Sequence, residues 1–138
     1  MKRTALVIGL TLAVGMYLGA IGNEVLHAKP EPIKRTVLLK TDLVGMEGKE
    51  AILALAEIAP GAATGKHTHP GYEFAYVLEG SGTLEIEGKP SIPLTPGTAI
   101  YQPSTQVHRG VNDSSTAPLK IFSVYILEKG HPLAEPAK

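Results

Sequence analysis

The chain of 138 residues contains no cysteine and no tryptophan, and it has no excess of charge of either sign. Without cysteine, disulfide bonds, thiolate metal sites and cysteine nucleophiles are all excluded. The formal net charge of +0 gives no electrostatic reason to expect nucleic-acid binding, because that function needs a basic face. Aromatic residues make up only 5% of the chain, so a packed core must be mainly aliphatic.

Glycine and proline, in contrast, are abundant, with 15 and 11 residues. They cluster in turn signals that separate several short apolar runs. One run, TLEIE, alternates apolar and polar residues with the period of two that is typical of a half-buried strand. The runs lie at 36–40, 51–58, 73–80, 83–88, 98–103, 107–112 and 119–127.

This spacing of runs and turns predicts an all-β domain over residues 36–128, built as an antiparallel barrel or sandwich. The run at 51–58 is also compatible with a helix, because alanine and leucine are strong helix formers. Its short length and the Pro60-Gly61 pair that follows favour a strand. Residues 129–138 are predicted to form a loose C-terminal tail.

The N-terminus carries a long uncharged segment. Residues 5–22 are apolar and follow Lys2 and Arg3, a pattern that is typical of an export signal. The run just reaches the length of about 20 residues that spans a bilayer as a helix. We therefore predict that residues 1–28 are a cleaved signal peptide or a retained inner-membrane anchor, and that the rest is exported to the periplasm or the extracellular space. Residues 29–35 contain two prolines and are predicted to be an extended linker.

Histidine and glutamate cluster in the segment GKHTHPGYEF, residues 65–74. His67 and His69 are two positions apart, so on a strand both imidazoles can face one cavity. Glu73 follows a turn-like pair and can bring a carboxylate to the same cavity. Imidazole nitrogen and carboxylate oxygen suit iron, manganese, nickel, copper or zinc. His108, on a separate strand-like run, is the candidate for a fourth ligand.

The spacing of this segment resembles the first motif of the cupins, which is glycine, five residues, H-x-H, three or four residues, glutamate, six residues and glycine. The fixed positions are occupied here by Gly61, His67, His69, Glu73 and Gly80.

The second cupin motif is matched more loosely, by Gly88, Pro96-Gly97, Pro103, His108 and Asn112. A proline directly precedes Gly97, and the gap from Gly97 to His108 is longer than the strict motif allows. Over about residues 45–127 the chain is similar to small single-domain cupins of the cupin-2 type.

The resemblance implies a jelly-roll barrel of six to eight antiparallel strands that binds one divalent metal ion through His67, His69, Glu73 and His108. Such a metal acts as a Lewis acid or a redox centre. The implied activities are those of a dioxygenase, an isomerase or a lyase on a small organic molecule, with Glu73 as the proton acceptor. The positions with a structural role in the motifs are Gly61, Gly80, Gly97 and Asn112.

Two other functions stay open. The barrel can be a non-catalytic module that binds a small ligand or a metal, or a structural protein that acts through its surface. Strand alternation predicts that Ala75 and Val77 face inward with Glu73. The outward residues of the same run would contact the second subunit of a homodimer or covering strands; they are Phe74, Tyr76 and Leu78.

Other polar and aromatic residues near the motifs receive no catalytic role. Tyr72 and Lys66 neighbour the ligands and are predicted to point away from the metal, and Arg109 to lie at a solvated rim. Alternation does not settle whether the remaining aromatic residues of the barrel are core or pocket wall; they are Tyr101, Phe122 and Tyr125.

Overall fold

The structure is a computed structural model that describes residues 31–138. The predicted signal peptide or anchor helix at residues 1–28 lies outside the described residues. Within 31–138 the chain forms strands, turns and loops, and this part contains no helix long and apolar enough to cross a membrane.

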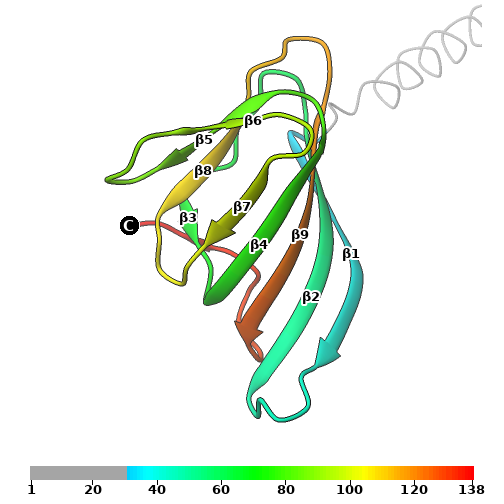
Figure 1. Ribbon diagram of the computed structural model, residues 1–138, viewed down its shortest axis with the longest axis vertical. Coiled ribbons are helices and arrows are strands. Elements are labelled where there is room, and N and C mark those ends of the chain that lie inside the picture. The colour runs from blue at the N-terminus through cyan, green and yellow to red at the C-terminus, as the bar shows by residue number, and fades with distance from the viewer. Residues whose placement is uncertain (1–30) are drawn as a thin grey trace, which may run out of the picture. The chain divides into compact units, whose positions relative to one another are not determined.

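Two antiparallel sheets of five strands each build the domain (Figure 1). The first sheet has the spatial order β1-β2-β9-β4-β7, and most of its strands are long. They are β1 (Ile33–Asp42), β2 (Lys49–Ile58), β4 (Gly71–Glu79), β7 (Ala99–Gln102) and β9 (Leu119–Glu128).

The second sheet has the spatial order β10-β3-β8-β5-β6, and its strands are short. They are β3 (His67–Thr68), β5 (Gly82–Ile86), β6 (Ile92–Leu94), β8 (His108–Asn112) and β10 (Glu135–Pro136). The all-β antiparallel prediction is confirmed, and the segment at 51–58 is strand rather than helix. Eight strands have three or more residues; the two-residue strands β3 and β10 are too short to leave a periodic signal in the sequence.

The structure corrects two predicted boundaries. Strand β1 begins at Ile33, so the last residues of the predicted 29–35 linker belong to a strand. The prediction of a loose tail at 129–138 was wrong, because β10 pairs with β3 and the backbone N–H of Ala137 donates to the carbonyl of Lys66 at 3.0 Å.

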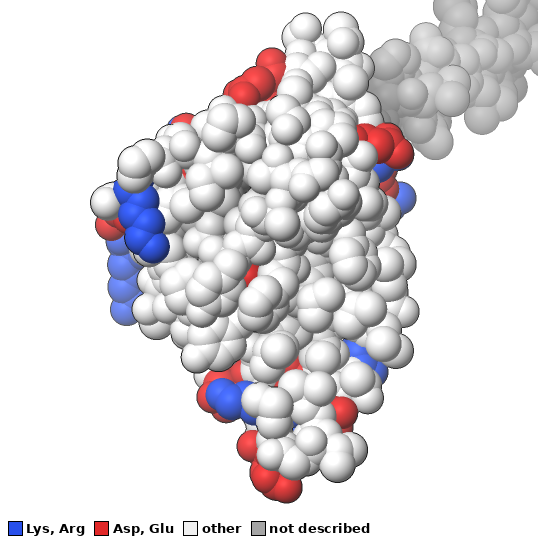
Figure 2. Space-filling model, viewed as in Figure 1, with Lys and Arg blue, Asp and Glu red and all other residues white. Residues whose placement is uncertain are grey.

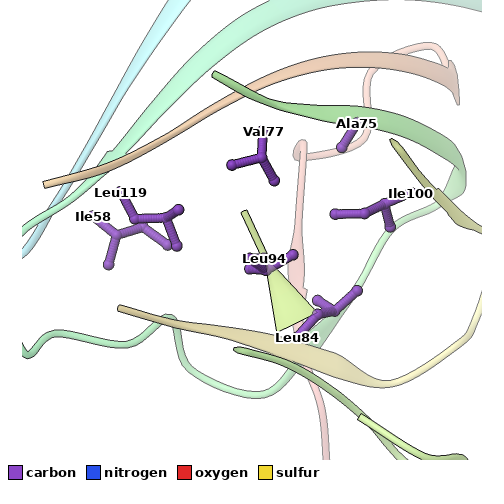
Figure 3. Close-up of a cluster of buried hydrophobic side chains, with 7 residues drawn as sticks. All are labelled: Ile58, Ala75, Val77, Leu84, Leu94, Ile100 and Leu119. Atoms are coloured by element: carbon purple, nitrogen blue, oxygen red, sulfur yellow. The ribbon is translucent and has the colours of Figure 1, made fainter. Parts of the chain in front are cut away.

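The main core lies between the two sheets, where aliphatic side chains of both meet (Figure 3). Each fully buried valine, leucine or isoleucine contributes about 1.5–3 kcal/mol to stability. The cluster consists of Ile58, Ala75, Val77, Leu84, Leu94, Ile100 and Leu119. A second cluster of Ile52, Ala54, Tyr125 and Leu127 lies on the neighbouring strands β2 and β9 and packs against Leu133 of the C-terminal segment.

Strand β4 has one face toward this core and the other toward solvent. Its alternate residues Gly71, Glu73, Ala75 and Val77 are buried. The residues between them are exposed, with Tyr72, Phe74, Tyr76 and Leu78 each 44–47% accessible. The predicted inward and outward faces of this strand are therefore confirmed, and each inward position can supply a group to the interior.

Candidate metal centre

The structure brings the four predicted ligand residues together between the sheets. His67 lies on β3 and pairs in register with His108 on β8, and their ring centroids are 4.4 Å apart. His69 directly follows β3, with its ring 5.0 Å from that of His67 and 5.1 Å from that of His108. Glu73 reaches the same point from β4, in the opposite sheet. Each sheet thus contributes to one cluster.

Backbone carbonyls fix the tautomer of all three imidazoles. The Nδ1 atoms donate to three different carbonyl oxygens: His67 to Gly65 at 2.8 Å, His69 to Leu133 at 2.6 Å and His108 to Gln106 at 2.9 Å. A carbonyl oxygen only accepts, so each Nδ1 carries a hydrogen, and in the neutral imidazole Nε2 keeps a free lone pair. This is the arrangement that metal-binding histidines adopt.

These imidazoles and one carboxylate oxygen face a common centre. One ring nitrogen from each of the three histidines lies within 4.8 Å of the other two. The Glu73 Oε2 atom is 3.1 Å from His69 Nε2 and 3.5 Å from His108 Nε2. The His69 Nε2 atom is buried and has no hydrogen-bond partner within residues 31–138.

Lone pairs and a carboxylate that face each other in a buried space are stabilised by a cation between them. A divalent metal meets that requirement, and three nitrogens with one oxygen suit iron, manganese, nickel, copper or zinc. The residues present therefore fit one metal ion held by His67, His69, Glu73 and His108.

The electrostatics of the cluster keep His67 and Glu73 in the form that binds a metal. Burial, helped by the neighbouring His108 and His69, lowers the pKa of His67 to about 4, so this imidazole is neutral at physiological pH. Burial acts to raise the pKa of Glu73, but the close approach of His108 and His69 and the hydrogen bond from Ser123 outweigh it and hold the pKa well below its ordinary value. Metals bind neutral imidazole and ionised carboxylate, so neither group needs to lose a proton near neutral pH.

Strand β9 supplies Ser123, which the sequence did not point to, and Tyr125, which was predicted to be core or pocket wall and lines the cavity. The Ser123 hydroxyl donates to Glu73 Oε1 at 2.9 Å and orients the carboxylate. Tyr125 pairs in register with Glu73, and its ring centroid is 5.0 Å from that of His69. Burial, reinforced by the charge of Glu73, raises the pKa of Tyr125 above its ordinary value, so its hydroxyl is a neutral donor beside the ligands. The run LKIFSVYIL is apolar on both faces, so alternation alone could not place either residue.

The cluster opens into a cavity of about 50 Å³ between the sheets, which has room for a few water-sized groups. Its walls are mainly aliphatic, with Tyr125, Thr64 and Ser123 as neutral polar groups and Arg35 as a cation. The apolar wall residues are Ala56, Ile58, Ala75, Leu84, Ile100 and Ile121.

Another buried polar group lies beside the cluster. Gln102 on β7 pairs in register with Glu73 and is only 1% exposed, and its Nε2 atom has no hydrogen-bond partner among the described residues. Tyr101, which was predicted to be core or pocket wall, is instead 54% exposed on the outer face of β7. Lys66 and Arg109 are engaged in ion pairs with Glu87 and Glu85.

The motif residues that were predicted to have a structural role lie in turns and at strand ends. The Asn112 side chain is buried and donates to the carbonyls of Ile58, Ala59 and Ala117 at 2.9–3.1 Å. Gly80 has φ +89°, and a Cβ there would lie 2.4 Å from the Pro118 carbonyl oxygen, so this position requires glycine. Gly61 and Gly97 lie in turns.

Strand β4 also contains a glycine that the motif reasoning did not select. Gly71 lies between His69 and Glu73, and a Cβ there would lie 2.1 Å from the carbonyl oxygen of Ile126 on β9. The close approach of β4 to β9 brings Glu73 next to Ser123 and Tyr125, so this glycine is part of how the site is built.

Comparison with known proteins agrees with this geometry. The chain is 33% identical over 88 residues to the dimethylsulfoniopropionate lyase DddW of Ruegeria pomeroyi, a match that covers 62% of this chain and 57% of that protein. The chain thus spans little more than half the length of this relative.

Solved structures of similar fold include a cupin-like protein from Thermotoga maritima, with a TM-score of 0.61 and 25% identity over 76% of this chain and 75% of that one. They also include the DMSP lyase DddQ of Ruegeria pomeroyi, with a TM-score of 0.63 and 19% identity over 81% of this chain and 55% of that one. Residues 54–125, which include all four ligand residues, match the family profile of the cupin domain. The chain belongs to the cupin family.

Proposed function

We propose that this protein is a metal-dependent enzyme that acts on a small organic molecule, and that its reaction is of the lyase type. The observation that carries the proposal is the convergence of one ring nitrogen from each of three histidines with the Glu73 carboxylate, beside a small, mostly apolar cavity that His67, Glu73 and His108 line. The sequence similarity to a dimethylsulfoniopropionate lyase supports lyase chemistry over the dioxygenase and isomerase alternatives.

A bound divalent metal would supply a Lewis acid that stabilises negative charge developing on a substrate oxygen. The residues of the chain would bind, orient and exchange protons. The aliphatic wall excludes water around the substrate, and the neutral Tyr125 hydroxyl can donate a hydrogen bond to a substrate oxygen.

Glu73 is the proposed proton acceptor. Its lowered pKa makes the carboxylate a weak base, so it can deprotonate only a carbon that is already acidified, such as one next to a carbonyl or carboxylate group. An elimination that begins with removal of such a proton is the lyase reaction most compatible with this base.

The proposal is tested with the full chain, loaded separately with each candidate metal and incubated with dimethylsulfoniopropionate and other small β-substituted acids. We expect elimination product from at least one substrate, and Glu73→Gln to abolish turnover while most of the metal is kept. Unchanged activity in Glu73→Gln would contradict the role of Glu73, and no product with any metal would contradict the lyase assignment.

We also propose that the outer face of the first sheet pairs two copies of the chain into a homodimer. Charged side chains lie mainly at the margins of the face over β4 and β7 (Figure 2). The exposed ring of Tyr101 stacks on Phe74 with centroids 5.3 Å apart, beside a groove of about 420 Å³. Analytical ultracentrifugation should find a dimer for the chain and a monomer for Phe74→Lys; a monomeric parent would contradict the proposal.

Export remains a proposal that rests on residues 1–28, which are outside the described part. We propose that the mature domain works in the periplasm or the extracellular space, either released from its signal or held by residues 5–22 in the inner membrane. Cell fractionation with an antibody against the domain would find it outside the cytoplasm; a cytoplasmic pool alone would contradict export.

A further inference from the structure

Arg35 lies on the cavity side of strand β1. It is opposite Ala56 of β2 in the strand register, and both residues line the cavity together with His67, Glu73 and His108. Its neighbour Lys34 belongs to the other face of the strand and pairs with Glu57 at 3.7 Å. Alternation on β1 therefore directs one of two adjacent cations toward the metal ligands.

The guanidinium of Arg35 has no partner among the residues that the structure describes. Within residues 31–138 it forms no ion pair and no side-chain hydrogen bond, whereas Arg109 forms a bidentate pair with Glu85 at 2.7 and 3.0 Å. The charge of Arg35 nevertheless reaches the interior, where it opposes the rise in the pKa of Tyr125 that burial causes. Arg35 thus offers unused donors to a ligand at the cavity.

Other charges near the cavity mouth already have partners. A depression of about 210 Å³ adjoins the cavity and shares Arg35, Thr64 and His67 with it. Two further charged residues line this depression: Lys66 lies 3.6 Å from Glu87, and Glu135 lies 3.5 Å from His131, a pair that carries opposite charges only when His131 is protonated. Among the described residues at this mouth, Arg35 is therefore the cation that no carboxylate pairs with.

We infer that Arg35 binds the carboxylate of a small organic acid whose other end reaches the metal ligands, which makes short carboxylic acids the substrate class of this site. The inference rests on the proposed function, since it assumes a metal held by those ligands. Arginine presents a planar pair of donors that matches a carboxylate.

The charge balance and the walls of the site favour the same class of ligand. A dication with one carboxylate ligand and neutral imidazoles leaves a net charge of about +1, and Arg35 adds a second positive charge. The aliphatic side chains between Arg35 and the ligands suit a short hydrocarbon segment, and the cavity of about 50 Å³ limits its length.

Isothermal titration calorimetry on the metal-loaded full chain tests the inference. The probes are butanoate and 3-methylbutanoate, each compared with its uncharged amide. We expect both acids to bind and the amides to bind at least about tenfold more weakly. Arg35→Gln should weaken acid binding by about 10- to 100-fold, which corresponds to a charged hydrogen bond. Lys34→Gln, which removes the neighbouring cation on the opposite face, should bind the acids like the parent chain.

Three results would overturn the inference: failure of both acids to bind, equal affinity for acid and amide, or an Arg35→Gln variant that binds acids as well as the parent. Metal content measured on the same samples reports separately on the proposed function. Full metal loading without dependence on Arg35 would overturn this inference alone. A parent chain that takes up no metal would overturn the proposed function, and the inference with it.

Discussion

The two sheets hold their metal ligands by different means. The first sheet supplies Glu73 from the middle of a long strand, and a side chain of the adjacent strand, Ser123, orients it. The second sheet supplies three histidines from or beside very short strands, and each is oriented by a backbone carbonyl. A long sheet can hold a ligand through side chains because its register is fixed over many residues, whereas a short one needs support from the loops around it.

The largest effect is expected from breaking the register of the long sheet. Gly71→Ala would place a Cβ 2.1 Å from the Ile126 carbonyl oxygen, so β4 and β9 would have to separate. We expect the free energy of unfolding to fall by about 3 kcal/mol or more in urea titrations. Gly65→Ala is the matched control, since a Cβ there meets nothing within 4 Å. Equal stability of the two variants would mean that close approach of β4 and β9 is not required.

A smaller effect, on metal affinity rather than on folding, is expected from removing the groups that support the histidines of the short sheet. Ending the chain after His131 removes the Leu133 carbonyl that accepts from His69, and removes β10, which pairs with β3. We expect about 100-fold weaker metal binding, at the upper end of the range for groups that orient ligands, as measured by competition with a chelator.

The control for this truncation is Leu133→Ala, which keeps the carbonyl and should retain most of the affinity. If the truncated chain binds metal as tightly as the full chain, the C-terminal segment does not orient His69. The short sheet would then hold His69 without support from the segment around it, which would contradict the proposed difference between the two sheets.

Removing the side chain that orients Glu73 in the long sheet should weaken metal binding less than the C-terminal truncation does. Ser123→Ala deletes the donor to Glu73 Oε1, but Oε2 still faces the histidines, and the strand keeps its position. We expect about tenfold weaker metal binding in the same competition assay. A loss larger than that of the C-terminal truncation would reverse the comparison, because the long sheet would then depend more on its supporting group.

A further effect concerns pH and the metal-free protein. In metal-free protein the folded state lowers the pKa of His67 to about 4 from an ordinary value of 6.5. Between these values the unfolded chain binds a proton that the folded chain does not, so stability falls as the pH is lowered from 6.5. The contribution of Glu73 has the same sign but is lost only below its ordinary value of 4.5.

This pH dependence is measured by urea titrations at pH 6.5, 5.5 and 4.5 in the presence of a chelator. His67→Gln should flatten the decline over this interval, because the titrating group is gone. A decline of equal size in the parent and in His67→Gln would show that another group is responsible.

The sequence predicted the strands and the residues that gather in the candidate metal centre better than it predicted what supports them. His67, His69 and Glu73 share a short segment with cupin spacing, and His108 follows from the second motif, so the structure brings together residues already selected. The alternation of β4 could also be predicted from the sequence, because one of its faces is buried in the core and the other is exposed to solvent.

The groups that support the site could not be predicted from the sequence, because they depend on pairing between distant parts of the chain. The Leu133 carbonyl meets His69 across 64 residues, and Arg35 reaches the cavity only through the register of β1 with β2. Backbone carbonyls leave no residue-type signal, and Arg35 looks like any charged residue of a polar segment. The tail was predicted to be loose because a two-residue strand shows no periodicity.

The most direct test of the account is the metal content of the purified full chain, measured by plasma mass spectrometry beside a His67→Ala/His69→Ala control. We predict close to one divalent ion per parent chain, retained through gel filtration and lost in the control, because the three Nε2 atoms and Glu73 are already arranged around one centre. No metal in the parent, even after reconstitution with iron, manganese, nickel, copper and zinc in turn, would contradict the central claim that these four residues form a metal site.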